Sequence, residues 1–554
     1  MVSMSGVNYG DLTMKSGSPF CKSMVAVTAA ALFLLCAFPR HTAAQDDPPD
    51  RVAQLNLAQG SVSFQPSGEK DWVDADPNRP LTTGDSLWAD QDARGELHIG
   101  NTSIRISSQT GLTFLNLNDR TVQIQLAQGS MEVTLRQLDS GDAFEIDTPN
   151  VAFSLLQPGT YRVDVDPQGQ TTAISVFDGQ GQVTGGGNSY NLNPGQRGSF
   201  TGTDTLSYDI TNLSANDDFD NWCHSRDDAE DQSASAQYVS TDVTGYRNLD
   251  GYGVWSEVPD YGEVWVPSGV PVGWAPYHFG HWVWIEPWGW TWVENEPWGF
   301  APFHYGRWAF VGARWAWVPG PRVVRPVYAP ALVAFVGGGG FHVAVGIGGG
   351  GPVAWFPLGP RDVYIPAYHA SPHYVQYVNV TNTHINAVSV TNVYNTRDTS
   401  ATRITYENQN VAGSVTAVSH DTFVNARPVA DAVIRVNSEQ LRGAEVVSAA
   451  PVAPQRQSII GASAAARVRP PAATMNRSVV AKLSPPPPPV SYDRKAPQLT
   501  ANPGHPLTPE KVEQLRKPGE EYQHPNVKYA PPARPAAPAR APKPSKPPKS
   551  GKPH

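Results

Sequence analysis

The stretch that decides the fold reads Trp274-Ala275-Pro276-Tyr277-His278-Phe279-Gly280-His281-Trp282-Val283-Trp284. It returns 26 residues later as Phe300-Ala301-Pro302-Phe303-His304-Tyr305-Gly306-Arg307-Trp308-Ala309-Phe310. Each copy leads into a second alternating aromatic run, Trp290–Val293 and Trp315–Val318. Side chains that alternate at period 2 lie on opposite faces of a strand. The repeat therefore predicts two tandem β-hairpins in a Trp-rich domain over residues 238–320, and repeated units of this kind need a neighbour to bury a face.

The aromatic residues of this repeat allow two interpretations. They can lie exposed and stack on glycan, or they can fill the core, where each ring buries about 150–250 Å²; we favour the core. The candidate binding residues are Trp274, Tyr277, Trp282, Trp284, Trp290, Trp292, Trp308, Trp315 and Trp317. The equivalent His278 and His304 would make a poor metal site without nearby carboxylates or thiolates. We predict no catalytic residue, no cofactor and no metal.

Residues 51–202 alternate polar and apolar side chains over short runs that turns separate. Glu96–Ile99, Ser103–Ile106 and Tyr161–Val165 are examples, and their period is typical of half-buried strands. The run Leu57–Val62 returns as Leu126–Met131, with Ala-Gln-Gly-Ser in both copies. This echo indicates a repeated strand-turn unit in a β-rich domain.

The same residues resemble the FecR domain. The matching runs are Leu57–Val62, Leu81–Asp85, Arg94–Leu97, Phe144–Pro149, Pro158–Val163, Val176–Gly179 and Asn193–Gln196, together with Trp72. The resemblance implies an exported β module, a β-solenoid or a sandwich. Family members include membrane regulators that relay an iron-uptake signal to a sigma factor. Only about 23 residues precede the first apolar run, too few for a cytoplasmic anti-sigma domain. Residues 238–366 resemble an uncharacterised Trp-rich domain that accompanies FecR domains.

The N-terminus has the pattern of a secretory signal. Lys15 and Lys22 precede the apolar run Met24–Phe38, and small residues follow at Thr42-Ala43-Ala44. A run of this length is short for a membrane span of about 20 residues. We therefore expect a signal peptide over residues 1–44 and export to the periplasm or cell envelope, with an uncleaved anchor as the alternative. After cleavage, Cys223 would be the only cysteine, which rules out an intramolecular disulfide.

Residues 210–236 predict a helical connector. Ser214 or Asn216 can cap it, and Phe219 and Trp222 fall on one face. Its acidic residues are interpreted as a solvated face rather than a metal site. These residues are Asp227, Asp228, Glu230 and Asp231.

Residues 321–398 predict a Gly-rich and β extension. Two glycine tetrads, Gly337–Gly340 and Gly348–Gly351, make a poor membrane helix, so we do not favour membrane association. Residues 377–382 and 388–393 are predicted to form paired β-strands.

Residues 399–554 are expected to be largely disordered. Residues 452–554 contain 23 Pro, 17 Lys/Arg and 5 Asp/Glu, and so carry a net charge of +12. Because the whole chain has a net charge of −9, residues 1–451 carry −21. Pro-rich sequence with few aromatic residues does not bury enough apolar surface to order itself. This basic end could bind an anionic envelope polymer; nucleic acid is not expected.

The fold class that follows is mainly β, with one short connecting helix and a disordered Pro-rich tail. The leading functional hypothesis is a non-enzymatic cell-envelope scaffold that binds peptidoglycan, polysaccharide or an envelope protein, in part through exposed aromatic residues. The alternative is a periplasmic signal-relay component like other FecR-domain proteins. A glycan-acting enzyme comes third, because it needs two opposed carboxylates and the repeat offers only Glu286, Glu294 and Glu296.

Overall fold

The computed structural model describes residues 47–322, 325–337, 351–396, 405–437, 441, 444–519, 524 and 526–530. The predicted signal peptide and residues 338–350, which hold most of both glycine tetrads, lie outside the described residues. Among the described residues, none of the helices combines the length and the apolar character that crossing a membrane requires.

The N-terminal module consists of two β-sheets that share strand β9 (Thr121–Leu135). The first half of β9 pairs with β8 and β10, and the second half pairs with β7 and β12. Apolar side chains of both sheets fill a single core, which fits the sandwich alternative. The other strands are β1 (Ala53–Gln59), β2 (Val62–Gln65), β3 (Val73–Asp74), β4 (Pro80–Leu81), β5 (Ser86–Ala89), β6 (Arg94–Ile99), β7 (Thr102–Ile106), β8 (Thr110–Leu117), β10 (Ala143–Asp147), β11 (Ala152–Leu155), β12 (Gly159–Val165), β13 (Thr171–Val176), β14 (Gly181–Gly185), β15 (Asn188–Leu192), β16 (Gln196–Thr201) and β17 (Ser207–Asn212).

The echoed Ala-Gln-Gly-Ser motif marks the places where the chain crosses between the two sheets. Gly60 follows β1 of one sheet and precedes β2 of the other, with φ +75°. Gly129 lies where β9 changes partners, with φ +94°, and a Cβ there would lie 2.3 Å from Thr110 Oγ1. Only glycine adopts such a conformation without strain, which explains why the motif occurs at both crossings.

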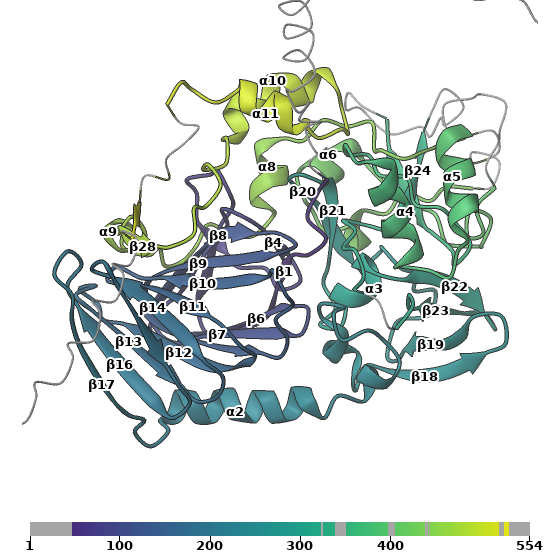
Figure 1. The fold of residues 1–554 in the computed structure, drawn as a ribbon. Coiled ribbons are helices and arrows are strands. Elements are labelled where there is room, and N and C mark those ends of the chain that lie inside the picture. Colours follow the sequence, from purple (N-terminus) through teal and green to yellow (C-terminus); the bar gives the residue numbers. More distant parts are fainter. Residues whose placement is uncertain are drawn as a thin grey trace, which may run out of the picture. The chain divides into compact units, whose positions relative to one another are not determined.

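Helix α2 (Asp218–Asp231) is the predicted connector, and its N-cap differs from the prediction. Asp217, rather than Ser214 or Asn216, accepts hydrogen bonds from the backbone N–H groups of Phe219 and Asp220. The Asp220 carboxylate in turn accepts a hydrogen bond from the Asp217 N–H, which completes a capping box. Figure 1 shows α2 running along the first module toward the Trp-rich domain.

Both predicted hairpins are present in the Trp-rich domain. In the first, β20 (Gly280–Ile285) pairs with β21 (Gly289–Glu294), and in the second, β22 (Arg307–Val311) pairs with β23 (Arg314–Val318). Trp282 lies opposite Trp292, and Trp308 lies opposite Trp317. The first half of the second repeat forms helix α3 (Phe300–His304), which the sequence did not predict. The remaining elements are η1 (Ala234–Gln237), η2 (Tyr246–Leu249), β18 (Gly253–Val258) and β19 (Gly262–Pro267).

The segment after the repeat shares a core with it. Strands β24 (Val333–Gly337) and β25 (Val353–Pro357) lie in the middle of a four-stranded sheet with β26 (Thr416–Val418) and β27 (Glu445–Val447). The prediction of paired strands at residues 377–382 and 388–393 was wrong, because helices α4 (Pro372–Val380) and α5 (Ala387–Thr396) cover this stretch. Ser371 caps α4 and Pro372 stands in its first turn, a helix start that outweighs the β-branched residues. Helix α6 (His420–Val424) and turn η3 (Ala430–Ala432) follow.

The described part of the Pro-rich segment is more ordered than expected. Its backbone pairs with the first module at Val73–Ala465 and Thr148–Val480, and Leu499 lies in the core of the Trp-rich domain. The described residues of this segment form no separate hydrophobic cluster, and several of its apolar side chains pack on the other two modules. Its elements are α8 (Arg456–Ile460), α9 (Ala472–Met475), β28 (Val479–Ala481), α10 (Tyr492–Ala501), α11 (Pro509–Gln514) and β29 (Val527–Tyr529). The basic end, residues 531–554, lies outside the described residues.

Candidate functional site

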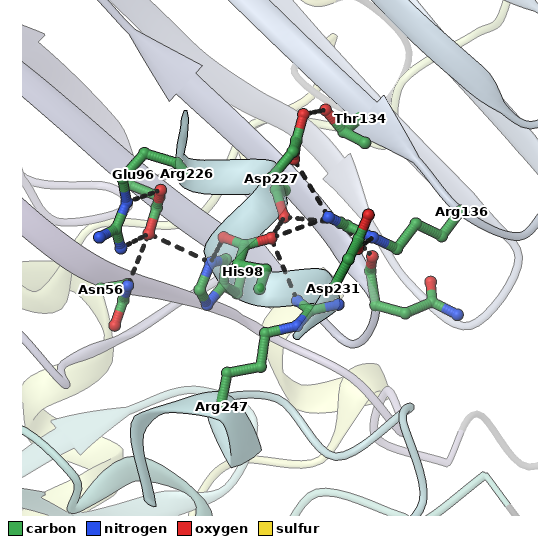
Figure 2. A network of polar contacts seen from close by, with 12 residues as sticks. Asn56, Glu96, His98, Thr134, Arg136, Arg226, Asp227, Asp231 and Arg247 are labelled. Atoms are coloured by element: carbon green, nitrogen blue, oxygen red, sulfur yellow. Dashed lines mark hydrogen bonds and ion pairs between the residues drawn. The ribbon is translucent and has the colours of Figure 1, made fainter. Parts of the chain in front are cut away.

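A buried network of charged residues joins helix α2 to the first module (Figure 2). Strands β6 and β7 present polar side chains on one face, and α2 covers that face with its acidic side. The network combines four carboxylates, four guanidinium groups and one imidazole. Its members are Glu96, His98, Arg105, Arg136, Arg226, Asp227, Glu230, Asp231 and Arg247.

Glu96 on β6 is fully buried and saturated by donors. Its carboxylate accepts hydrogen bonds from Arg105 Nε at 2.9 Å and from Arg226 Nη2 at 2.6 Å. Asn56 Nδ2 donates a further bond at 2.7 Å. Since Arg105 comes from β7 and Arg226 from α2, this one carboxylate connects the helix to the sheet.

Glu230 near the end of α2 contacts cations from three parts of the chain. His98 Nε2 lies 2.9 Å away, and Arg105 Nη2 lies 2.9 Å away, both from the first module. Arg136 Nη2 lies at 3.1 Å, beyond the end of β9. Arg247 Nη1, in turn η2 of the Trp-rich domain, lies at 3.5 Å. Glu230 is therefore the point at which the first module, the connector and the Trp-rich domain meet.

The electrostatics of the cluster favour its charged form. Burial opposes ionisation of Glu96 and Glu230, but hydrogen bonds from Arg226 and His98 to Glu96, and from His98 to Glu230, hold the pKa of each carboxyl below its usual range. Burial likewise opposes protonation of His98, yet its bonds to Glu230 and Glu96 raise the pKa of the imidazole. The groups stabilise one another's charges, as buried ion pairs must.

Glu96, His98 and Glu230 also have the composition of a metal site. Their ligand atoms lie within 4.8 Å of one another, and all three residues are buried. However, Arg105 contacts both carboxylates, and a divalent cation would have to displace it. The donor set therefore fits a network of ion pairs better than a metal centre.

A second titratable group lies beside the network. Glu132 on β9 is buried, and desolvation together with the charge of Asp220 raises its pKa to about 8. Cys223 of α2 is buried next to it, and burial raises the pKa of its thiol. A buried thiol with a raised pKa is unreactive, so Cys223 serves as a small core residue.

All nine candidate binding residues lie in the core. The most exposed of them, Trp274, retains 7% of its surface, and Tyr277, Trp292 and Trp317 retain none. Trp282 packs edge to face on Trp292 with ring centroids 5.4 Å apart. The structure thus corresponds to the core-packing interpretation, because each ring finds a partner in the neighbouring strand or sheet. None of the nine presents a face to solvent.

Of the other candidates from the repeat, His304 and Glu294 are buried, whereas His278, Glu286 and Glu296 are half-buried. His304 bonds the carbonyl oxygen of Ala329 through Nδ1, and burial lowers its pKa to about 4. Glu294 is buried and accepts a hydrogen bond from Trp292 Nε1. Glu286 pairs with Lys495 at 2.7 Å. Among the described residues, these acids and histidines do not gather into a cluster with the geometry of a metal site.

The sequence interpretation missed the network because it assigned the acids of α2 to a solvated face. Of these, Glu230 is buried and Asp227 largely so, whereas Asp228 is exposed as predicted. A signal was present: Glu96, His98, Ser103 and Arg105 alternate along two adjacent predicted strands. Because this shared face combines a carboxylate, an imidazole, a hydroxyl and a guanidinium group, the pattern is consistent with a face that another element covers rather than one exposed to solvent.

Two family models match separate parts of this chain. The FecR protein family matches residues 85–180, and a family of unknown function, DUF6600, matches residues 246–362. None of the curated proteins matches.

Two crystal structures of a candidate anti-sigma factor from Parabacteroides distasonis are similar in part. They are 14% and 13% identical to this chain, with a TM-score of 0.21 each. Each alignment covers 32% of this chain. The alignments cover 68% of the chain in the first crystal structure and 70% of the chain in the second. On the evidence of the family matches and the β-rich fold, the chain is a FecR-domain protein that carries a second domain from a family of unknown function.

Proposed function

We propose that this protein is a non-enzymatic signal-relay component of the cell envelope. In this proposal residues 1–44 direct export, and helix α2 couples the FecR module to the Trp-rich domain. The observation that carries the proposal is the position of Glu230, whose carboxylate contacts His98 and Arg105 of the FecR module and Arg247 of the Trp-rich domain. A relay needs such a connection, because two sites communicate only through an element that both of them bias.

The network suits a relay because its parts depend on one another. Moving Arg247 away from Glu230 would change the charge balance around His98 and Arg105, which share that carboxylate. In a buried setting an uncompensated charge costs several kcal/mol, about 3–5 when one partner is removed. A movement of the Trp-rich domain would therefore change the electrostatic energy of His98 in strand β6 and of Arg105 in strand β7.

A partner in the envelope completes the proposal. With the nine candidate rings in the core, aromatic stacking no longer supports peptidoglycan or polysaccharide as the ligand, and we propose an envelope protein instead. A purely structural scaffold remains the competing function, and the two differ in whether transcription depends on the protein.

The test compares variants of one helix. A deletion strain is complemented with the wild type, with Glu230→Gln or with Asp228→Asn, whose side chain is exposed on the same helix. We expect deletion to change the transcription of uptake genes, Asp228→Asn to restore it, and Glu230→Gln to restore it poorly at equal protein level. An unchanged transcriptome in the deletion strain would refute the relay and favour the scaffold.

A further inference from the structure

The outer face of one sheet of the FecR module carries polar side chains that the Pro-rich segment covers. Core residues of β9 alternate with Gln123 and Gln125, so these two side chains point away from the core. On the neighbouring strand β10, Glu145 lies beside Gln123 in the register. All three side chains are buried, because residues 464–483, here called the strap, lie over them.

The polar side chains of this face bond to the backbone of the strap. Glu145 Oε1 accepts a hydrogen bond from the N–H of Leu483 at 2.8 Å, and Gln123 Nε2 donates to the carbonyl oxygen of the same residue at 3.1 Å. Gln125 Nε2 donates to the carbonyl oxygen of Arg477 at 3.2 Å. Because every residue other than proline offers the same N–H and C=O groups, these bonds recognise an extended backbone rather than one particular sequence.

The strap is held less firmly than the strands beneath it. The Ala466 N–H donates to the carbonyl oxygen of Trp72 at 3.0 Å. The Val480 N–H donates to that of Thr148 at 2.8 Å, within a single antiparallel bridge rather than a continuous ladder. Most side chains of residues 464–473 are exposed. A segment with few buried apolar contacts opens at a lower free energy than core strands do.

Two features of the strap add side-chain specificity to these backbone contacts. The guanidinium group of Arg477 donates to the carbonyl oxygens of Ala127 at 2.8 Å and Pro167 at 2.9 Å. Strand β28, the apolar run Val479–Ala481, is buried against β9, β10 and β11. In peptide recognition of this kind, main-chain bonds supply affinity and side-chain pockets supply specificity. An extended peptide with an arginine two residues before a small apolar run would repeat all of these contacts.

We propose that this face binds an extended segment of a partner protein, and that the strap occupies the face when the partner is absent. Because the strap belongs to the same chain, it competes at a high effective concentration, and the partner gains access only when the strap opens. Exchange of straps with a second copy would repeat the same contacts and add none, so we assign the face to a different protein. The face lies on the other sheet from the network around Glu230, and neither proposal depends on the other.

Fluorescence anisotropy with a labelled synthetic peptide of residues 464–483 tests the face on the full-length protein. In an opened variant, Ala466→Pro and Val480→Pro together remove two N–H donors of the strap and leave every residue of the face unchanged. We expect the peptide to bind this variant about tenfold more tightly than the wild type, or better, because the competing strap is weakened. Adding Glu145→Met to the opened variant should weaken binding about tenfold. Adding Glu257→Met, at an exposed position of β18, is the matched control and should have no effect.

A second peptide separates backbone recognition from attraction between charges. It has the same sequence and the same four basic side chains, but the backbone nitrogens at the positions of Val480 and Leu483 carry methyl groups. Methylation removes the donors to Thr148 and Glu145, so we expect about tenfold weaker binding to the opened variant. Equal binding of the two peptides would overturn the proposal, because it would show that charge rather than backbone is recognised.

Three other outcomes would also overturn the proposal. The first is an opened variant that is folded by near-UV circular dichroism and binds the peptide no more tightly than the wild type. The second is a concentration-dependent dimer of the wild type in sedimentation, which would assign the face to a second copy. The third needs no variant: in hydrogen exchange of the wild type, the amides of Val480 and Leu483 should exchange faster than those of β10. Equal protection would show that the strap does not open separately.

Discussion

The charged network around Glu230 and the Trp-rich core differ in whether their buried polar groups have partners. In the network around Glu230, the four carboxylates that form it each contact at least one cation. In the Trp-rich core, the indole N–H groups of Trp265, Trp274, Trp282, Trp284 and Trp288 have no hydrogen-bond partner among the described residues. Ion pairs stabilise the network, whereas aromatic packing stabilises the Trp-rich core. In that core the packing energy outweighs the cost of several indole N–H groups without hydrogen-bond partners.

This difference predicts which perturbations each region will feel. Removing a charge in the network leaves its partner buried and uncompensated, and the effect depends on pH. Removing a ring from the Trp-rich core leaves a cavity, and that effect is nearly independent of pH. The contrast is open to test by substitutions in both regions.

Trp282→Ala should have the largest effect. Trp282 packs against Trp292, Phe335, Trp355 and Phe423, so its loss removes contacts with two sheets and with α6. We expect a loss of about 3–5 kcal/mol in the free energy of unfolding, measured by urea denaturation with near-UV circular dichroism. Trp282→Phe is the control and should cost less. A loss below about 1 kcal/mol for the alanine variant would contradict a core built on ring packing.

Arg105→Met should have the next largest effect. Arg105 is fully buried and contacts Glu96, Asp227 and Glu230, and methionine retains its apolar volume but not its charge. The expected loss is about 3 kcal/mol at pH 7, because Arg136 and Arg226 still offset part of the negative charge. The loss should shrink as the pH falls, because the carboxyl groups that lose Arg105 take up protons more readily in the variant than in the wild type. A loss that stays the same between pH 4 and pH 7 would indicate lost packing rather than lost charge.

Glu132→Gln should stabilise the protein at high pH, and this is the smallest of the three effects. Because burial raises the pKa of Glu132 to about 8 from an unfolded value near 4.5, the folded state keeps a proton that the unfolded state releases. The stability of the wild type therefore falls as the pH rises from 4.5 through 8, and the glutamine variant escapes this loss. The full shift would correspond to at most about 5 kcal/mol. We expect a gain of about 1–3 kcal/mol at pH 8, because relaxation around a buried charge reduces its penalty, and almost none at pH 4.5. An equal gain at both pH values would show that Glu132 does not titrate in this window.

The parts of the fold that the sequence predicted are those in which local pattern and tertiary contact agree. Trp282 and Trp292 alternate with small or β-branched residues, so the same period that predicts a strand also forms the core. The crossing at Gly129 shows in the sequence as an echo of Gly60, since both positions need the same backbone conformation.

The parts that escaped prediction depend on contacts between distant segments. The sequence around Glu230 does not indicate that its carboxylate contacts His98 and Arg247. These contacts form because α2 packs on the sheet and turn η2 lies beside the end of α2. The ordered portion of the Pro-rich segment is a similar case, because Val480 and Leu499 become buried only against surfaces that other modules provide. The composition of a segment indicates how much apolar surface it can bury by itself. It does not indicate how much the segment can bury against surfaces of other modules.

Hydrogen exchange of the Glu230→Gln variant tests the coupling between the modules most directly. If Glu230 couples the modules, exchange of backbone amides should become faster in strands β6 and β7 and in residues 246–249, as well as in α2. Asp228→Asn should leave all of these segments unchanged. Faster exchange confined to α2 in the Glu230→Gln variant would contradict the account, because it would show that the FecR module and the Trp-rich domain do not depend on the carboxylate they share.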